Sequence, residues 1–90
     1  MQSLTITVKG RVQGVCFRAY TQKTARQLDI TGQVKNQIDG SVEIQATANE
    51  KDLQKFVQWC HSGPLLAKVT EVTVTQLTTV TKYINFEIID

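Results

Sequence analysis

The apolar residues follow two different periods along the chain, and each period predicts a different kind of element. Leu4, Ile6 and Val8 alternate with polar residues, which is typical of a half-buried strand. From Phe17 the spacing becomes helical, and we expect a helix that Gly32 ends. The predicted apolar side of this helix consists of Phe17, Tyr20, Thr24, Ala25 and Leu28.

A β-hairpin is predicted after this helix. One strand runs from Gln33 to Ile38, and another carries an apolar residue at every second position from Val42 to Ala48. Asp39-Gly40 lies between the two strands. This dipeptide predicts a type I′ turn, which needs a positive φ at both positions.

The rest of the pattern predicts a second helix and two more strands. Asn49 is a good N-cap, and Asp52 stands at the third helical position, where its charge complements the exposed amides. Gly63-Pro64 ends this helix. Its apolar stripe consists of Leu53, Phe56, Val57 and Cys60. The next strand changes phase between Val69 and Val72, which predicts a β-bulge, and a short final strand follows with Ile84, Phe86 and Ile88.

The order β-α-β-β-α-β-β predicts the fold class. We expect an α+β sandwich in which both helices cover one face of a mainly antiparallel sheet. Its β-α-β-β-α-β part is the split βαβ, or ferredoxin-like, arrangement, to which the short last strand is added. The length of 90 residues fits a single domain, which we place at residues 1–90. Because this fold hosts many functions, the function has to be inferred from a site.

Composition and charge limit the classes of partner that we expect the chain to bind. The sequence has neither an apolar run of membrane length nor a signal-peptide pattern, so we expect a cytoplasmic monomer without a membrane partner. The net charge of +2 is too small to indicate a nucleic-acid partner. Residues 9–26 nevertheless lack Asp and Glu, which fits an anionic ligand as well as a solvated basic face. The basic residues of this stretch are Lys9, Arg11, Arg18, Lys23 and Arg26.

The cysteines and the histidine offer little for metal or disulfide chemistry. Cys16 and Cys60 lie far apart and form no CxxC pair, so we expect reduced thiols that act as small apolar residues. His61 is the sole histidine, and no cluster of His, Cys and carboxylates surrounds it in the sequence. We therefore expect no bound metal and no other cofactor.

The segment from Gly10 to Arg18, GRVQGVCFR, joins the first strand to the first helix. Its glycines at positions 10 and 14 allow backbone conformations that are closed to other residues. The first amides of a helix lack intrahelical partners, and with the positive end of the helix dipole they form an anion site. The planar guanidinium of Arg18 can bind two phosphate oxygens at once. A plain strand-to-helix turn with an exposed arginine would give the same pattern.

Asn36 lies in the second predicted strand, on the face that also holds Val34 and Ile38. A buried amide at this position needs hydrogen-bond partners, or it costs about 1–3 kcal/mol of stability. It can bond to local backbone near the end of the strand, or it can present its amide to a water or a substrate oxygen. The strand pattern alone leaves both interpretations open.

The string GRVQGVCFR resembles the signature of the acylphosphatase family. GQVKN, DGSVE, GPLLAKVTEV and the closing FEI are similar to segments of the same family and occur in the same order. The resemblance therefore covers nearly the whole chain, and it implies the ferredoxin-like fold.

The resemblance also implies a reaction and a site. The reaction is hydrolysis of the carboxyl–phosphate bond of an acyl phosphate to a carboxylate and inorganic phosphate, without a metal and without a covalent intermediate. The amides of Val15, Cys16, Phe17 and Arg18 are implied to cradle the phosphate, and Arg18 to be the essential binding residue. Asn36 falls where the family keeps the asparagine that positions the attacking water. The substrate phosphate would take the proton, since no side chain of these segments is an obvious general base.

Three other residues could take part in the site or border it. A helix N-terminus lowers the pKa of a thiol, which makes Cys16 a rival nucleophile. Cysteine phosphatases, however, have the spacing C-x5-R, and here only Phe17 separates Cys16 from Arg18. Gln33 stands where many family members have an aromatic residue, which affects the wall of the acyl pocket. His61 is expected to be a surface residue at the end of a helix.

Two other function classes share features of this sequence. RNA-binding modules have the same β-α-β-β-α-β order, but they need aromatic stacking residues on the central strands, and residues 4–8 and 41–48 contain none. A regulatory or carrier-type domain could bind an anion without catalysis. The presence of both Arg18 and Asn36 argues against this class, and a hydrolysis assay separates the two.

Overall fold

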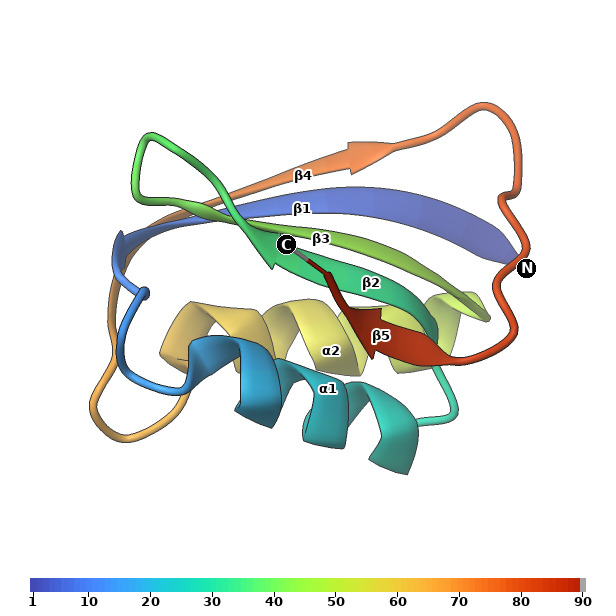
Figure 1. The fold of residues 1–90 in the computed structure, drawn as a ribbon. Helices are drawn as coiled ribbons and strands as arrows, with labels where there is room; N and C mark the ends of the chain where they lie inside the picture. Colours follow the sequence, from blue (N-terminus) through green and yellow to red (C-terminus); the bar gives the residue numbers. More distant parts are fainter. Residues whose placement is uncertain (90) are drawn as a thin grey trace.

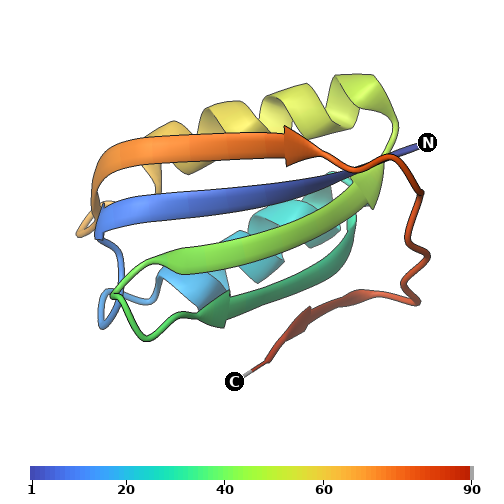
Figure 2. The ribbon, with the colours of Figure 1, turned by 90° about the horizontal axis from the view of Figure 1, so that it is seen from above.

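The computed structural model describes residues 1–89 and contains the predicted elements in the predicted order. These are β1 (Gln2–Arg11), α1 (Phe17–Gln27), β2 (Thr31–Asn36), β3 (Val42–Ala48), α2 (Glu50–Ser62), β4 (Lys68–Gln76) and β5 (Phe86–Ile88). The strands form one sheet in the order β4-β1-β3-β2-β5, in which only β2 and β5 run parallel. Both helices cover the same face of the sheet, as Figure 1 and Figure 2 show. The ferredoxin-like α+β sandwich is therefore confirmed.

The core lies between the sheet and the two helices. Ile6 and Val34 pair with Ile44 from either side of β3, and all three are fully buried. The predicted stripe of α2 faces this layer, with Leu53, Phe56 and Cys60 buried and Val57 partly buried. The predicted cap of α2 is also present, since the Asn49 side chain accepts a hydrogen bond from the Asp52 N–H at 2.9 Å.

The buried face of α1 differs from the predicted one. Phe17, Thr21 and Ala25 are buried, whereas Tyr20 is 49% exposed. Positions four apart lie on one side of a helix, and the series of three that starts at Phe17 is the one that faces the core. Thr21 is tolerated in the core because its hydroxyl donates to the Phe17 carbonyl at 2.7 Å.

The helix α1 also ends before Gly32, the residue predicted to end it. Asp29 adopts the left-handed conformation (φ 56°), and the Ile30 N–H donates to the Ala25 carbonyl at 2.8 Å. This is the pattern of a Schellman-type C-terminus, with aspartate where glycine is usual. Gly32 instead lies within β2, where an added Cβ would collide with the Gln45 carbonyl oxygen of β3.

The predicted bulge lies between β1 and β4. Lys9 pairs with Glu71 and Gly10 pairs with Val69, so Thr70 is the extra residue. A Cβ on Gly10 would collide with the backbone of β4, and this close approach explains the glycine. The bulge comes directly before the chain leaves β1 for the connection to α1.

The β2–β3 turn is not the predicted type I′ turn, since Gly40 has a positive φ (92°) and Asp39 does not. The Gln37 N–H donates to the Ser41 carbonyl (2.8 Å), and the Gly40 N–H donates to the Gln37 carbonyl (3.1 Å). This is the pattern of a three-residue hairpin loop. The Asp39 carboxylate accepts bonds from the N–H (2.9 Å) and the hydroxyl (2.6 Å) of Ser41, which stabilises the longer loop.

The final strand begins later than predicted. It starts at Phe86, and Ile84 is fully exposed in the connection that precedes it. Gln22 and Arg26 of α1 hold this strand in place, because their side chains donate to the Phe86 carbonyl at 3.0 and 3.2 Å. Within residues 1–89, no helix combines the length and the apolar character needed to cross a membrane.

Candidate active site

The connection between β1 and α1, residues 12–16, forms one wall of the candidate site. Val12 is buried and anchors the connection at its start. Gly14 has a φ of 76°, and an added Cβ would meet no atom within 4 Å. The left-handed backbone conformation therefore explains this glycine, because there is room for a side chain. We call residues 12–16 the phosphate loop below, after the role that the resemblance described above implies for this segment.

The phosphate loop delivers the chain to α1 in an unusual conformation. Cys16, the N-cap residue, has φ 62° and ψ 24°, in the left-handed region that non-glycine residues rarely adopt. Positive φ at Gly14 and at Cys16, followed by helical residues from Phe17, gives the alternation of hand that turns successive N–H groups toward one point. Such a concavity binds anions.

The start of α1 differs from the start of α2 in the groups that complement its exposed backbone amides. The side chain of Asn49 caps α2, and Glu50 and Asp52 provide negative charge in the first turn. Within the described chain the Cys16 side chain makes no capping hydrogen bond, and the first turn of α1 contains no acidic residue. The positive end of the α1 dipole therefore lacks the protein anion that would complement it.

Phe17 fixes the start of α1 to the core. Its side chain is 1% exposed, and its ring lies 5.6 Å from that of Trp59, measured between centroids. An added Cβ on Gly63 would lie 2.8 Å from the Phe17 ring, so the chain after α2 also packs against it. These contacts anchor the start of α1, where the phosphate loop ends, at the edge of the core.

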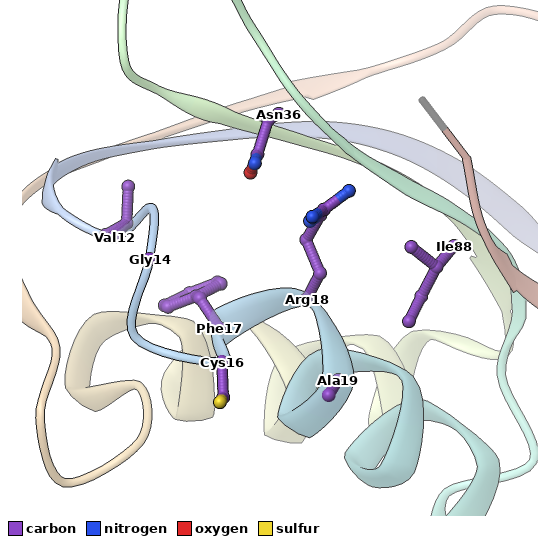
Figure 3. Close-up of a pocket in the computed structure, with 8 residues that line it drawn as sticks. All are labelled: Val12, Gly14, Cys16, Phe17, Arg18, Ala19, Asn36 and Ile88. Atoms are coloured by element: carbon purple, nitrogen blue, oxygen red, sulfur yellow. The ribbon is translucent and has the colours of Figure 1, made fainter.

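A pocket of about 350 Å³ lies above the first turn of α1. Figure 3 shows the Arg18 side chain rising from α1 toward β2, with Asn36 on one side and Ile88 on the other. The pocket thus brings together Arg18, the residues around the phosphate loop and Asn36, although Asn36 is distant from the other two in the sequence. Its lining consists of Val12, Gly14, Cys16, Phe17, Arg18, Ala19, Asn36 and Ile88.

Asn36 is the last residue of β2, and its amide points down from the sheet toward the phosphate loop (Figure 3). Among residues 1–89, no hydrogen-bond donor reaches its buried Oδ1. An unsatisfied buried acceptor is costly in a folded protein, so its presence calls for an explanation. Ile38, predicted to share the face of Asn36, is fully exposed in the hairpin loop, so Asn36 ends the apolar row of β2.

The side of the pocket that Ile88 forms was not predicted from the sequence. Ile88 lies on β5, which pairs with β2 through Val34, and it reaches the pocket because both strands end at the same edge. Ala19 follows Arg18 in the first turn of α1 and also lines the pocket. The sequence contained a signal for the strand, in the apolar residues at 86 and 88, but no signal for its neighbour in the sheet.

The other candidate residues lie apart from the pocket centre. Cys16 is exposed, contrary to the expected apolar role, and Figure 3 shows its sulfur pointing away from Arg18 and Asn36. Cys60 is buried as expected, and burial raises the pKa of its thiol to about 12. His61 borders a separate hollow between α2 and the β1–β4 edge. No group of three or more His, Cys, Asp or Glu residues that could hold a metal ion occurs within residues 1–89.

Comparison with known proteins identifies the family of this site. The family model for acylphosphatase matches residues 4–88. The chain belongs to the acylphosphatase family. The acylphosphatase of Shewanella amazonensis is 41% identical to it over 88 residues, which cover 98% of this chain and 97% of that protein.

Solved acylphosphatases have the same architecture as this chain. The crystal structure of acylphosphatase from Bacillus subtilis matches with a TM-score of 0.97 and 40% identity, covering 100% of both chains. The structure of an acylphosphatase from Coxiella burnetii matches with a TM-score of 0.93 and 34% identity, covering 97% of this chain and 90% of that one. The chain is therefore an acylphosphatase, a hydrolase that acts on acid anhydrides.

Proposed function

We propose that this acylphosphatase binds the phosphate of its substrate with the amides of Val15, Cys16, Phe17 and Arg18 and with the Arg18 side chain. Asn36 positions the water that attacks the phosphorus, and no metal takes part. The single observation that carries this proposal is the pocket in which the start of α1 and Arg18 face the buried Oδ1 of Asn36. Among residues 1–89, no side chain caps that helix start and no donor reaches this oxygen. The products are a carboxylate and inorganic phosphate.

The phosphate side of the reaction depends on fixed positive charge. The start of α1 and the Arg18 side chain border the same pocket (Figure 3), so the helix amides and the guanidinium can approach a phosphoryl group from one side. Charge on the three outer oxygens of that group is spread in the transition state, and preorganised donors stabilise it without moving. Because a carboxylate is a good leaving group, strong acid assistance is unnecessary.

The water side of the reaction depends on Asn36. A carboxamide oxygen accepts hydrogen bonds, so a water can donate one hydrogen to Oδ1 and turn a lone pair toward the phosphorus. This use explains why Oδ1 is buried without a donor from the described residues, 1–89. Holding the water beside a bound phosphoryl group supplies catalysis by proximity.

The proton released by the water goes to the substrate. The residues that line the pocket include no carboxylate, histidine or lysine, and the Cys16 sulfur points away from its centre. The phosphate oxygens are therefore the basic groups closest to the water. Neither a guanidinium nor a carboxamide group acts as a base in a protein, so the side-chain types of Arg18 and Asn36 offer no proton acceptor.

An assay of benzoyl phosphate hydrolysis tests the reaction, and its pH dependence tests the proton path. We expect kcat to be nearly flat from mildly acidic to neutral pH, with any slope following the ionisation of the substrate phosphate. The measurement is kcat against pH for two acyl phosphates whose phosphate pKa values differ. An inflection that stays near ~6.5 for both substrates and disappears in His61→Gln would make His61 the base instead. An inactive folded protein would support an anion-binding domain without catalysis.

Neither thiol nor metal should be needed for activity. We expect Cys16→Ser, and the wild-type enzyme after exhaustive treatment with a chelator, each to keep most of the wild-type kcat. The reasons are the outward sulfur of Cys16 and the amide cradle, which provides the positive charge that a metal would otherwise supply. A trapped phosphocysteine at Cys16, or activity that only added metal restores, would show the opposite.

A further inference from the structure

Gln13, in the phosphate loop, binds the hairpin that carries Asn36. Its Nε2 donates to the carbonyl oxygen of Gln37 at 2.8 Å and to that of Ser41 at 2.9 Å. Gln37 directly follows Asn36, and the Asn36–Val42 pair is the last of the β2–β3 ladder. One side-chain amide therefore joins the loop beside the phosphate cradle to the end of the strand that holds Asn36.

The hairpin loop does not depend on Gln13 for its own closure. The carbonyl of Gln37 also accepts from the Gly40 N–H (3.1 Å), and that of Ser41 also accepts from the Gln37 N–H (2.8 Å). A carboxamide nitrogen has two hydrogens, and here each has an acceptor in the other loop. The two bonds thus fix the distance between the phosphate loop and the hairpin.

We propose that Gln13 is a positioning residue that holds Asn36 at a fixed distance from the phosphate cradle. This role rests on the function proposed above, in which the cradle binds the phosphoryl group and Asn36 binds the water. The separation of phosphorus and water then depends on how the phosphate loop and the β2–β3 hairpin are joined. A displacement of about 1 Å can cost about 100-fold in rate. Gln13 itself does not line the pocket, so it acts through Asn36.

The first test is Gln13→Met, which keeps an unbranched side chain and removes both donors. We expect kcat to fall between about 10-fold and 100-fold, while the inhibition constant for inorganic phosphate stays close to the wild-type value. The matched control is Gln37→Met, which removes an amide that donates to Glu43 (3.3 Å) and keeps the backbone carbonyl that Gln13 binds. This control should have the wild-type kcat. A wild-type kcat in Gln13→Met would overturn the proposal.

A double-mutant cycle separates positioning from a merely structural role. In an Asn36→Ala background the water has already lost its holder, so Gln13→Met should then cause little further loss of kcat. If the two losses multiply instead, Gln13 acts on the cradle or on the fold as a whole, and the proposal is wrong.

A pH profile provides a second readout and remains available if Gln13→Met does not fold. In Gln13→Glu the ionised carboxyl has no hydrogen to donate and faces two carbonyl oxygens, whereas the protonated form can donate to one of them. The kcat of Gln13→Glu should therefore rise as the pH falls through the pKa of the new carboxyl, which its acceptors raise above ~4.3. The Asp39 carboxylate of the same hairpin already accepts hydrogen bonds from Ser41, which hold its pKa below the ordinary value of an aspartate. A profile parallel to that of the wild type would contradict the role.

Failure of the positioning role can be distinguished from failure of the proposed function. If Arg18→Ala and Asn36→Ala keep their activity, the assigned site is wrong, and with it the role of Gln13. If both lose activity while Gln13→Met keeps the wild-type kcat, only the role of Gln13 is wrong.

Discussion

Arg18→Ala should reduce kcat/KM for benzoyl phosphate by roughly a thousandfold or more, the loss expected for an arginine that clamps a transferring phosphoryl group. The Arg18 side chain rises from the first turn of α1 into the pocket, where it lies between Asn36 and Ile88 (Figure 3). Its planar fork can bind two phosphate oxygens at once, and it needs no rearrangement as charge develops. Alanine leaves the loop amides in place, so weak phosphate binding should remain.

Two further variants show whether the shape of the Arg18 side chain or its positive charge is responsible for the activity that Arg18→Ala loses. Arg18→Lys keeps the positive charge and loses the fork, so most of the defect should remain. Arg11→Ala removes a positive charge from the end of β1, outside the pocket lining, and should have a kcat/KM close to that of the wild type. The far-UV spectrum and the Tm establish that each variant is folded. Near-normal activity in a folded Arg18→Ala protein would exclude this pocket as the phosphate site.

The elements that could be predicted are those whose signal lies in a short stretch of sequence. The stripe Leu53, Phe56 and Cys60 repeats at helical spacing, and all three residues are buried. The bulge was visible because the apolar phase changes between Val69 and Val72. That the chain forms one domain and acts as a cytoplasmic monomer stays a prediction.

Two of the errors arose where a polar side chain forms a hydrogen bond that apolar periodicity does not indicate. The Thr21 hydroxyl bonds to its own helix, which moved the buried face of α1 away from the predicted Tyr20. The Asp39 carboxylate bonds to Ser41, which lengthened the hairpin loop. Apolar periodicity contains no information about such bonds, because they depend on the geometry of the folded backbone.

The candidate site was predictable in part. The loop and Arg18 form one continuous motif, and Asn36 stood out as a polar residue on an apolar face. The contributions of Ile88 and Gln13 were not predictable, since each depends on a neighbour that is distant in the sequence. A strand order or a side-chain bond between two loops becomes visible only in the folded chain.

Asn36→Ala should reduce kcat by about 100-fold, the scale of a misplaced reacting group, while inorganic phosphate still inhibits competitively. The cradle and Arg18 are unchanged in this variant, so phosphate binding should be kept. If phosphate affinity collapses while turnover continues, Asn36 is a binding residue and does not position the water. Competitive inhibition and kcat, measured on the same preparation, decide between the two.

The stability of Asn36→Ala provides an independent check on the same residue. Oδ1 is buried without a protein donor among residues 1–89, so it adds no hydrogen bond between protein groups to the fold. Alanine removes no such bond, so the free energy of unfolding should stay the same or increase although activity is lost. A residue that served only the fold would behave in the opposite way, because its removal would destabilise the protein in proportion to its contacts. Loss of activity together with retained stability is therefore the result that marks Asn36 as a residue kept for catalysis.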